Sequence, residues 1–241
     1  MKYIQKRLNH FIGEAIMRYG MIEDGDRILV AVSGGKDSLT LLWFLRERLK
    51  WIPIKYSLIA VYVDLGFNEE SGKRMEDFFR ENGFEYRIIR TNIAEKAKKS
   101  KKSPCFLCSR MRKKVLFETA DKLGCQKIAV AHNRDDVIET FFLNLFYGAS
   151  ISTMLPVQEF FNGRFKIIRP LYMADERLIK RCFKTIGWKE IDTGCPFSKE
   201  TKRSKIREFL EKVYLYDRRI KENIFHAMHN VREGYLPSYI S

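Results

Sequence analysis

The chain has 241 residues, 45% of them hydrophobic, and its 45 Lys and Arg against 30 Asp and Glu give a formal net charge of +15. This length suits one large domain or one domain with an appendage, and the absence of any run of about eighteen apolar residues argues against a membrane span or secretory signal, so we expect a cytoplasmic protein. The positive charge favours a polyanionic partner, with a generally basic proteome as the alternative.

The first predicted elements are a helix over about residues 2–20, with Gly20 as its stop, and a strand over RILVAV, residues 27–32. We expect residues 1–24 to form a helical extension and residues 25–198 the main domain. Residues 199–241 are expected to form a charged helical tail, whose apolar stripe is Ile206, Leu210 and Val213.

SGGKDS, residues 33–38, follows this strand and has the composition of a phosphate cradle. Gly34 and Gly35 let backbone N–H groups converge on an anion, and the N-terminus of the next helix points its dipole at the same place. Lys36 adds a positive charge, Ser33 and Ser38 add hydroxyl donors, and Asp37 can cap the helix or hold Mg²⁺. A plain strand-to-helix turn is the alternative, but it would not need Lys and two Ser.

Further short β-branched strands are predicted at 57–63, 86–90, 127–131 and 165–170, separated by segments of helical periodicity. This alternation predicts an α/β fold, a parallel sheet with helices on both faces. Ligands of such sheets bind at the carboxyl ends of strands, where SGGKDS and the end of VYVD, Asp64, lie.

The basic residues gather in four clusters, at residues 95–103, 109–114, 198–207 and 216–221. The first of these clusters, 95–103, is expected to be a solvated loop.

Five cysteines, an odd number, argue against a disulfide framework and leave metal binding or catalysis open. Cys105 and Cys108 have C-x-x-C spacing at a predicted helix N-terminus, where the basic side chains Arg110, Arg112, Lys113 and Lys114 are expected to lower the thiol pKa values. The pair alone could be half a zinc site, a redox dithiol or a coincidence, and no histidine has finger-like spacing to it. A third candidate is Cys195, whereas Cys125 and Cys182 are predicted to be structural.

AHNRDD, residues 131–136, again places polar side chains after a strand. Asp135 and Asp136 suit a helix N-terminus as caps, or alternatively contact Mg²⁺ or nucleotide. His132 is a candidate contact for a phosphate or a base.

The order of these motifs resembles a known family. SGGKDS looks like the pyrophosphate loop of the ATP pyrophosphatase (PP-loop) superfamily, whose adenine nucleotide alpha hydrolase-like domains cleave ATP between the α and β phosphates. MIEDGDRILVAVSGGKDS (21–38), CFLCSRMRKKVLFETADKLG (105–124), AHNRDDVIETFFLNLFYG (131–148), IIRPL (167–171) and HAMHNV (226–231) resemble the tRNA 2-thiocytidine synthetase family over nearly the whole chain.

The resemblance implies adenylation of the 2-oxygen of cytidine 32 in a tRNA anticodon loop and its replacement by sulfur. Cys105, Cys108 and Cys195 would bind a [4Fe–4S] cluster, and sulfide held on its open iron would be transferred. ATP and Mg²⁺ would lie at SGGKDS, with Ala31 and Asp64 near the adenosine; Asp64 as a loop cap is the alternative. Arg112, Ala131, His132 and Asp136 are further candidate nucleotide contacts.

The implied partners are tRNA and a sulfur donor, either a cysteine desulfurase or free sulfide, and the family also favours a homodimer. Relatives usually have a second C-x-x-C where this chain has Cys195 followed by Pro196, Phe197 and Ser198, so no spare thiol is left for a persulfide relay. Base-stacking candidates are Phe106, Phe146, Tyr147 and Phe197.

Four alternatives remain: thiolation of a uridine or another base, a lysidine-type ligase, a redox sensor that makes no product, and a plain RNA-binding module. The ligase would not need the cysteines, and the uridine enzymes carry extra zinc-finger pairs. A sensor would release no pyrophosphate with tRNA, and an RNA-binding module leaves SGGKDS unexplained.

Overall fold

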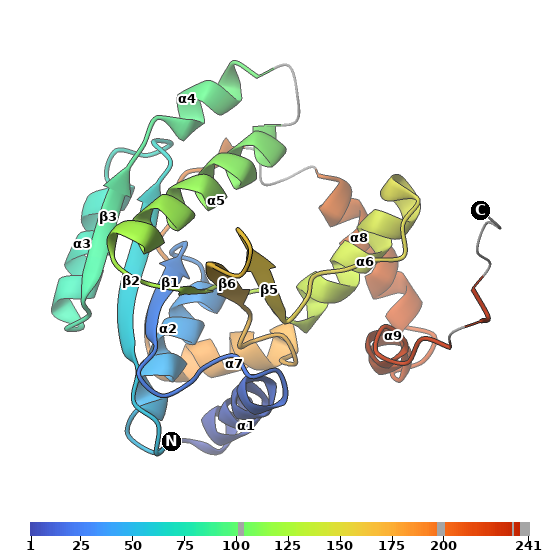
Figure 1. Ribbon diagram of the computed structural model, residues 1–241. Coiled ribbons are helices and arrows are strands. Elements are labelled where there is room, and N and C mark those ends of the chain that lie inside the picture. Colours follow the sequence, from blue (N-terminus) through green and yellow to red (C-terminus); the bar gives the residue numbers. More distant parts are fainter. Residues whose placement is uncertain (101–103, 197–200, 233, 237–241) are drawn as a thin grey trace. The chain divides into compact units, whose positions relative to one another are not determined.

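The computed structural model describes residues 1–100, 104–196, 201–232 and 234–236 (Figure 1). Phe197, one of the base-stacking candidates, therefore lies outside the described residues. The elements, in chain order, are α1 Tyr3–Arg18, β1 Arg27–Val32, α2 Lys36–Arg48, β2 Ser57–Asp64, α3 Ser71–Glu81, β3 Tyr86–Arg90, α4 Ile93–Lys98, α5 Pro104–Lys122, β4 Lys127–Ala129, α6 Arg134–Gly148, β5 Val157–Phe160, β6 Phe165–Ile168, α7 Glu176–Ile186, α8 Lys202–Tyr214 and α9 Ile220–Ala227.

The strands form one sheet in the order β3-β2-β1-β4-β6-β5. The predicted α/β fold is confirmed, because β3, β2, β1, β4 and β6 pair in parallel. Between β1 and β4 the direction in which strands are added reverses, and such a switch point is where sheets of this kind bind ligands. The sheet is not wholly parallel: β5, which we did not predict, pairs antiparallel with β6 at the edge.

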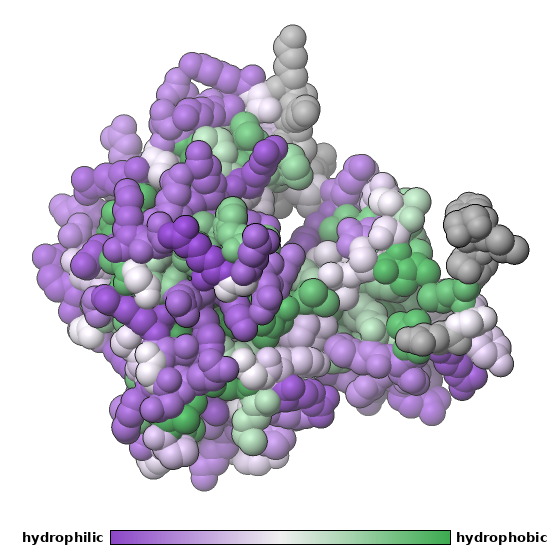
Figure 2. Space-filling model, viewed as in Figure 1, coloured by the Kyte–Doolittle hydropathy of each residue, from purple (hydrophilic) through white to green (hydrophobic). Residues whose placement is uncertain are grey.

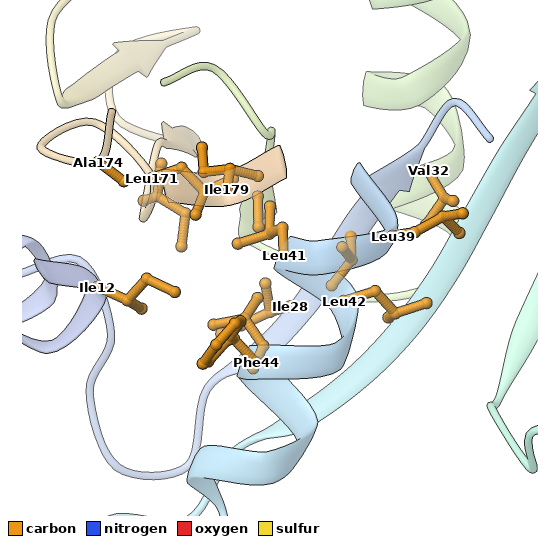
Figure 3. Packing of buried hydrophobic residues seen from close by; sticks show 14 of the residues in the cluster. Ile12, Ile28, Val32, Leu39, Leu41, Leu42, Phe44, Leu171, Ala174 and Ile179 are labelled. Atoms are coloured by element: carbon orange, nitrogen blue, oxygen red, sulfur yellow. The ribbon is translucent and has the colours of Figure 1, made fainter. Parts of the chain in front are cut away.

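Each face of the sheet has its own apolar core, because successive strand residues point to opposite sides. Ile28, Val30 and Val32 of β1 face one core, where the apolar sides of α1, α2 and α7 pack on the strands (Figure 3). Leu29 of β1 faces the other core, which α4 and α5 cover. The predicted placement of helices on both faces is confirmed.

By its contacts the chain divides into two units. Unit 1 contains residues 1–134 and 155–198, which include the sheet, both cores and α1. Unit 2 contains residues 135–154 and 199–241, where α8 buries Ile206 and Leu210 of the predicted stripe. Of the residues that the structure describes, none belongs to a helix long and apolar enough to cross a membrane.

Part of the basic segment 95–103 departs from prediction. Residues 95–98 belong to α4 instead of a solvated loop, because Ile93, Ala94 and Ala97 bury one side of that helix. Residues 101–103 lie outside the described residues.

Candidate functional site

The phosphate loop joins β1 to α2 at the switch point of the sheet. Gly34 has φ +87°, a left-handed conformation that favours glycine, and a Cβ there would lie 2.7 Å from the carbonyl oxygen of Ile191. The Ser38 hydroxyl donates to the Gly35 carbonyl at 2.9 Å and accepts from the Ser33 N–H at 3.1 Å. The loop is therefore folded by its own hydrogen bonds, with α2 starting at Lys36.

Lys36 is the charged group of this loop, and it is held by two carboxylates. Its Nζ lies 2.7 Å from Glu176 Oε1 and 3.1 Å from Asp37 Oδ2. Burial alone would lower the pKa of Lys36, but the charges of Asp37 and Glu176 outweigh burial and raise the pKa above its ordinary value. The side chain therefore stays cationic, as contact with a phosphate requires. Sequence reasoning missed Glu176, which is 140 positions away; its only local signal is the Asp175 cap before it.

Asp64 ends β2 at the same edge of the sheet, and its side chain is only 7% exposed. Its Oδ1 accepts the N–H of Gly66 at 3.0 Å, and Oδ2 lies 2.6 Å from where a Cβ on Gly72 would be. This is the loop-capping role given above as the alternative to a nucleotide contact. Ala31, the other predicted adenosine neighbour, is half-buried in β1.

His132 lies opposite the phosphate loop across the switch point. Val30 pairs with Ala129, and Ser33 and His132 each lie three residues beyond that pair. The half-buried His132 accepts a hydrogen bond at Nδ1 from Arg169 Nε, at 3.3 Å. In the neutral imidazole this leaves the proton on Nε2, so that His132 presents a donor. Half-buried Ala131 immediately precedes it.

Arg169, which holds His132, is a second residue that sequence reasoning missed. It follows β6 and is buried, and its other nitrogens donate to the Leu155 carbonyl at 2.6 Å and to Gln158 Oε1 at 3.3 Å. Burial lowers its pKa to about 10, which leaves it charged at neutral pH. The motif IIRPL contained this residue, but its partners lie on other segments.

Asp135 and Asp136 both belong to unit 2 and to the first turn of α6. Asp136 pairs with Arg203 of α8 at 3.1 Å, and Asp135 pairs with Lys221 of α9. The buried Glu139 in the next turn accepts from Arg207 at 2.7 Å. Within unit 2 these carboxylates therefore hold the C-terminal helices, and nucleotide or Mg²⁺ contact by Asp136 stays a prediction.

Two of the candidate ligand cysteines, Cys105 and Cys195, lie within electrostatic range of the third, Cys108. Cys105 is exposed and Cys108 half-buried in the first turns of α5, and Cys195 is half-buried in the segment after α7; among the described residues no disulfide involves them. Burial raises the pKa of Cys108, and the Cys195 and Cys105 thiols raise it further, while Arg112 acts in the opposite direction. The prediction that basic neighbours would lower this pKa is therefore wrong, because burial and the other thiols prevail.

The donor set suits an iron–sulfur cluster, whose irons are bound by thiolates. Among the described residues no three His, Cys, Asp or Glu side chains are arranged as a formed metal site, so the structure does not bring the three cysteines together as a closed ligand set. Cys125 and Cys182 are buried in the cores, as predicted.

The segment that carries Cys195 also touches the phosphate loop. The N–H of Ile191 donates to the Gly34 carbonyl at 3.0 Å. Further along, a Cβ on Gly194, which has φ +67°, would lie 3.1 Å from the Cβ of Asn68 in the loop after β2. Residues 191–195 therefore connect the phosphate loop to the third cysteine.

Comparison with known proteins gives consistent results. A family model described as a PP-loop domain matches residues 1–213. A tRNA-cytidine(32) 2-sulfurtransferase of Alkalilimnicola ehrlichii is 39% identical over 243 residues, covering 98% of this chain and 76% of that protein. Another from Chromobacterium violaceum is 37% identical, covering 97% and 74%.

Among solved structures, the U34-tRNA thiolase NcsA from Methanococcus maripaludis, determined with its [4Fe-4S] cluster, superposes with a TM-score of 0.77. It is 23% identical, and the match covers 94% of this chain and 78% of NcsA. At this identity the likeness shows the fold.

Proposed function

Since this chain belongs to the PP-loop family of tRNA-cytidine(32) 2-sulfurtransferases, and so is an ATP-dependent tRNA sulfurtransferase, we propose that it replaces the 2-oxygen of cytidine 32 with sulfur. The observation that carries the proposal is the segment 191–195. It hydrogen-bonds to the phosphate loop at Gly34 and ends at Cys195, so one stretch of chain links the group that activates oxygen to the group that holds sulfur.

The phosphate loop performs the activation. Its backbone N–H groups, the Ser33 and Ser38 hydroxyls and the Lys36 ammonium bind the ATP phosphates, and Asp37 supplies a carboxylate of the kind that Mg²⁺ prefers. The cytidine 2-oxygen attacks the α-phosphorus, the bond to the bridging oxygen breaks, and pyrophosphate leaves with that electron pair. AMP is then esterified to the base oxygen, which makes the oxygen a leaving group.

His132 and Arg169 serve the same step from across the switch point. With Nδ1 occupied by Arg169, the Nε2–H of His132 donates to a phosphate oxygen on which negative charge develops. Asp64 and Ala31 border the adenosine, and Arg112, Ala131 and Asp136 are further proposed contacts of the nucleotide.

Cys105, Cys108 and Cys195 hold the sulfur-carrying group. A [4Fe–4S] cluster held by these three thiolates would have one iron without a protein ligand, and that iron could carry the sulfide for transfer. The segment 191–195 supports this arrangement, because it links Cys195 to the phosphate loop. Sulfur attacks C2, the C2–O bond breaks, and AMP departs with the oxygen.

Anaerobic purification, with iron and acid-labile sulfide analysis, is the first half of the test. The second half incubates the protein with ATP, Mg²⁺, sulfide and unmodified tRNA and analyses the nucleosides by mass spectrometry. We expect about four irons per chain for a [4Fe–4S] cluster, and 2-thiocytidine formed with release of AMP and pyrophosphate. Thiolation by iron-free protein would overturn the cluster, and 2-thiouridine as product would overturn the base.

The sulfur donor and assembly are further parts of the proposal. Free sulfide or a cysteine desulfurase supplies the sulfur, and the enzyme acts as a homodimer. Comparing product formation with sulfide alone against desulfurase plus cysteine tests the donor, and light scattering of the purified protein tests the dimer.

A further inference from the structure

Phe106 is an apolar side chain kept exposed beside the ligand cysteines. It stands between Cys105 and Cys108 in the first turns of α5, and 62% of its surface is accessible. Neither core cluster includes it. A large aromatic ring left in water at such a place is a candidate contact for a partner.

The charges along α5 are divided between its two halves. Residues 104–114 include Arg110, Arg112, Lys113 and Lys114 and no acidic residue. Residues 115–122 include Glu118 and Asp121, which pair with Lys114 at 3.6 Å and with Arg164 at 2.5 Å. Positive charge is therefore concentrated at the cysteine end of the helix.

Helical spacing places the ring and three of these cations on one side. Phe106, Arg110 and Lys114 are four residues apart, Lys113 adjoins them, and all four are exposed. Cys108 and Arg112 are also four apart and lie on another side of the helix. The surface over α5 in this view is largely hydrophilic (Figures 1 and 2).

We propose that this α5 face, consisting of Phe106, Arg110, Lys113 and Lys114, is the docking surface for the RNA loop, with Phe106 stacking on an unpaired base. The inference rests on the proposed function and adds to it the place where the substrate binds. Charge favours RNA as the occupant, because phosphates are attracted to a face with three cations, of which only Lys114 pairs with a carboxylate among the described residues of this helix. A base in a loop is read by stacking on an aromatic ring once it leaves its own stack.

The test measures binding of unmodified tRNA to the iron-loaded enzyme without ATP, and then KM for tRNA with sulfide as donor. Phe106→Ala should weaken tRNA affinity roughly ten- to a hundredfold, the usual value of one base stacked on an aromatic ring. Phe106→Trp should restore it. Iron content, ATP affinity and melting temperature should stay at wild-type values in both variants.

Trp51→Ala is the matched control, because Trp51 is 70% exposed and follows α2, at the far end of that helix from the phosphate loop. It should leave tRNA affinity unchanged. Arg110→Ala and Lys113→Ala should each reduce the slope of log affinity against log salt by roughly 0.7, the value for one contact with a single strand. Equal tRNA affinity in Phe106→Ala and Trp51→Ala would overturn the proposal.

Two outcomes separate this inference from others. If Phe106→Ala slows only the desulfurase-dependent reaction and leaves tRNA affinity intact, the face binds a protein, and the RNA assignment is wrong. If wild-type enzyme forms no thiolated nucleoside, the proposed function fails, while the binding measurement without ATP still decides the docking surface.

Discussion

The phosphate loop keeps its shape through hydrogen bonds among Ser33, Gly35 and Ser38, whereas the cysteine centre gathers Cys105 and Cys108 from α5 and Cys195 from a segment far along the chain. Local bonds let the loop form before any nucleotide arrives. Burial and the other two thiols raise the pKa of Cys108, so this thiol holds its proton until a metal group replaces it. The phosphate loop is thus formed by the polypeptide alone, whereas the cysteine centre needs its cofactor to complete the ligand geometry.

The largest effect should come from Cys195→Ser, which removes a ligand from the half that needs a cofactor. Thiolation should fall below detection and iron content should drop, because two thiolates remain. ATP affinity should stay within about twofold, since the loop is folded by its own bonds. Cys125→Ala, at a buried thiol in the core, is the control and should retain iron. Undiminished iron in Cys195→Ser would remove this residue from the ligand set.

Gly34→Ala changes the phosphate loop, the part of the site that is already formed. The left-handed backbone would cost about 1–2 kcal/mol, and the new Cβ would press on the Ile191 carbonyl. If the contact moves the loop by about 1 Å, thiolation should fall about a hundredfold. Gly20→Ala, at φ +55° with nothing within 4 Å, carries the strain without the contact. Denaturant unfolding and ATP titration compare the two; equal behaviour would mean that the contact with Ile191 is unimportant.

Arg169→Lys tests whether His132, like the phosphate loop, is held in its working position by hydrogen bonds within the protein. Lysine keeps the charge but loses the planar fork that reaches three acceptors, so kcat should fall about tenfold, as for other residues that orient a functional side chain. KM for ATP should hardly change. Adding His132→Gln should produce little further loss, because both changes remove one interaction. Arg164→Lys, at an exposed pair, is the control.

Glu176→Gln should have the smallest effect and the opposite sign. Glu176 competes with phosphate for Lys36, and both side chains are partly exposed, so relief of that competition should tighten ATP binding only about two- to fivefold. Calorimetric titration measures the change, with Glu159→Gln at an exposed pair as the control. Weaker binding would show that Glu176 positions Lys36 for the nucleotide.

The sequence predicted the parts of the fold that depend on neighbouring residues. β1 and β2 are mostly apolar runs rich in Val and Ile, and two glycines, a lysine and two serines mark the loop between β1 and α2. β5 was missed because VQEF is short and contains two polar residues, as an edge strand can afford. α4 was missed because the many lysines of this segment indicated a solvated loop, although Ile93, Ala94 and Ala97 are buried.

Long-range pairs account for what could not be predicted in the site. Glu176 meets Lys36, and Arg169 meets His132, only after the strands take their order in the sheet. The raised pKa of Cys108 has the same origin, since Cys195 and burial act on it through the fold while the basic residues are its neighbours in sequence. The basic residues next to Cys108 in the sequence predicted a lowered pKa, whereas burial and the thiols near it in space raise the pKa.

The hydrogen bond from Ile191 to Gly34 also limits the distance between the phosphate loop and Cys195. Cys195 is four peptide units from Ile191, and four extended residues span at most about 14 Å. However the first two cysteines adjust around their cofactor, the third stays within this tether of the phosphate loop. In the proposed mechanism, the number of residues between Ile191 and Cys195 thus limits how far the third cysteine can lie from the loop that activates the base oxygen.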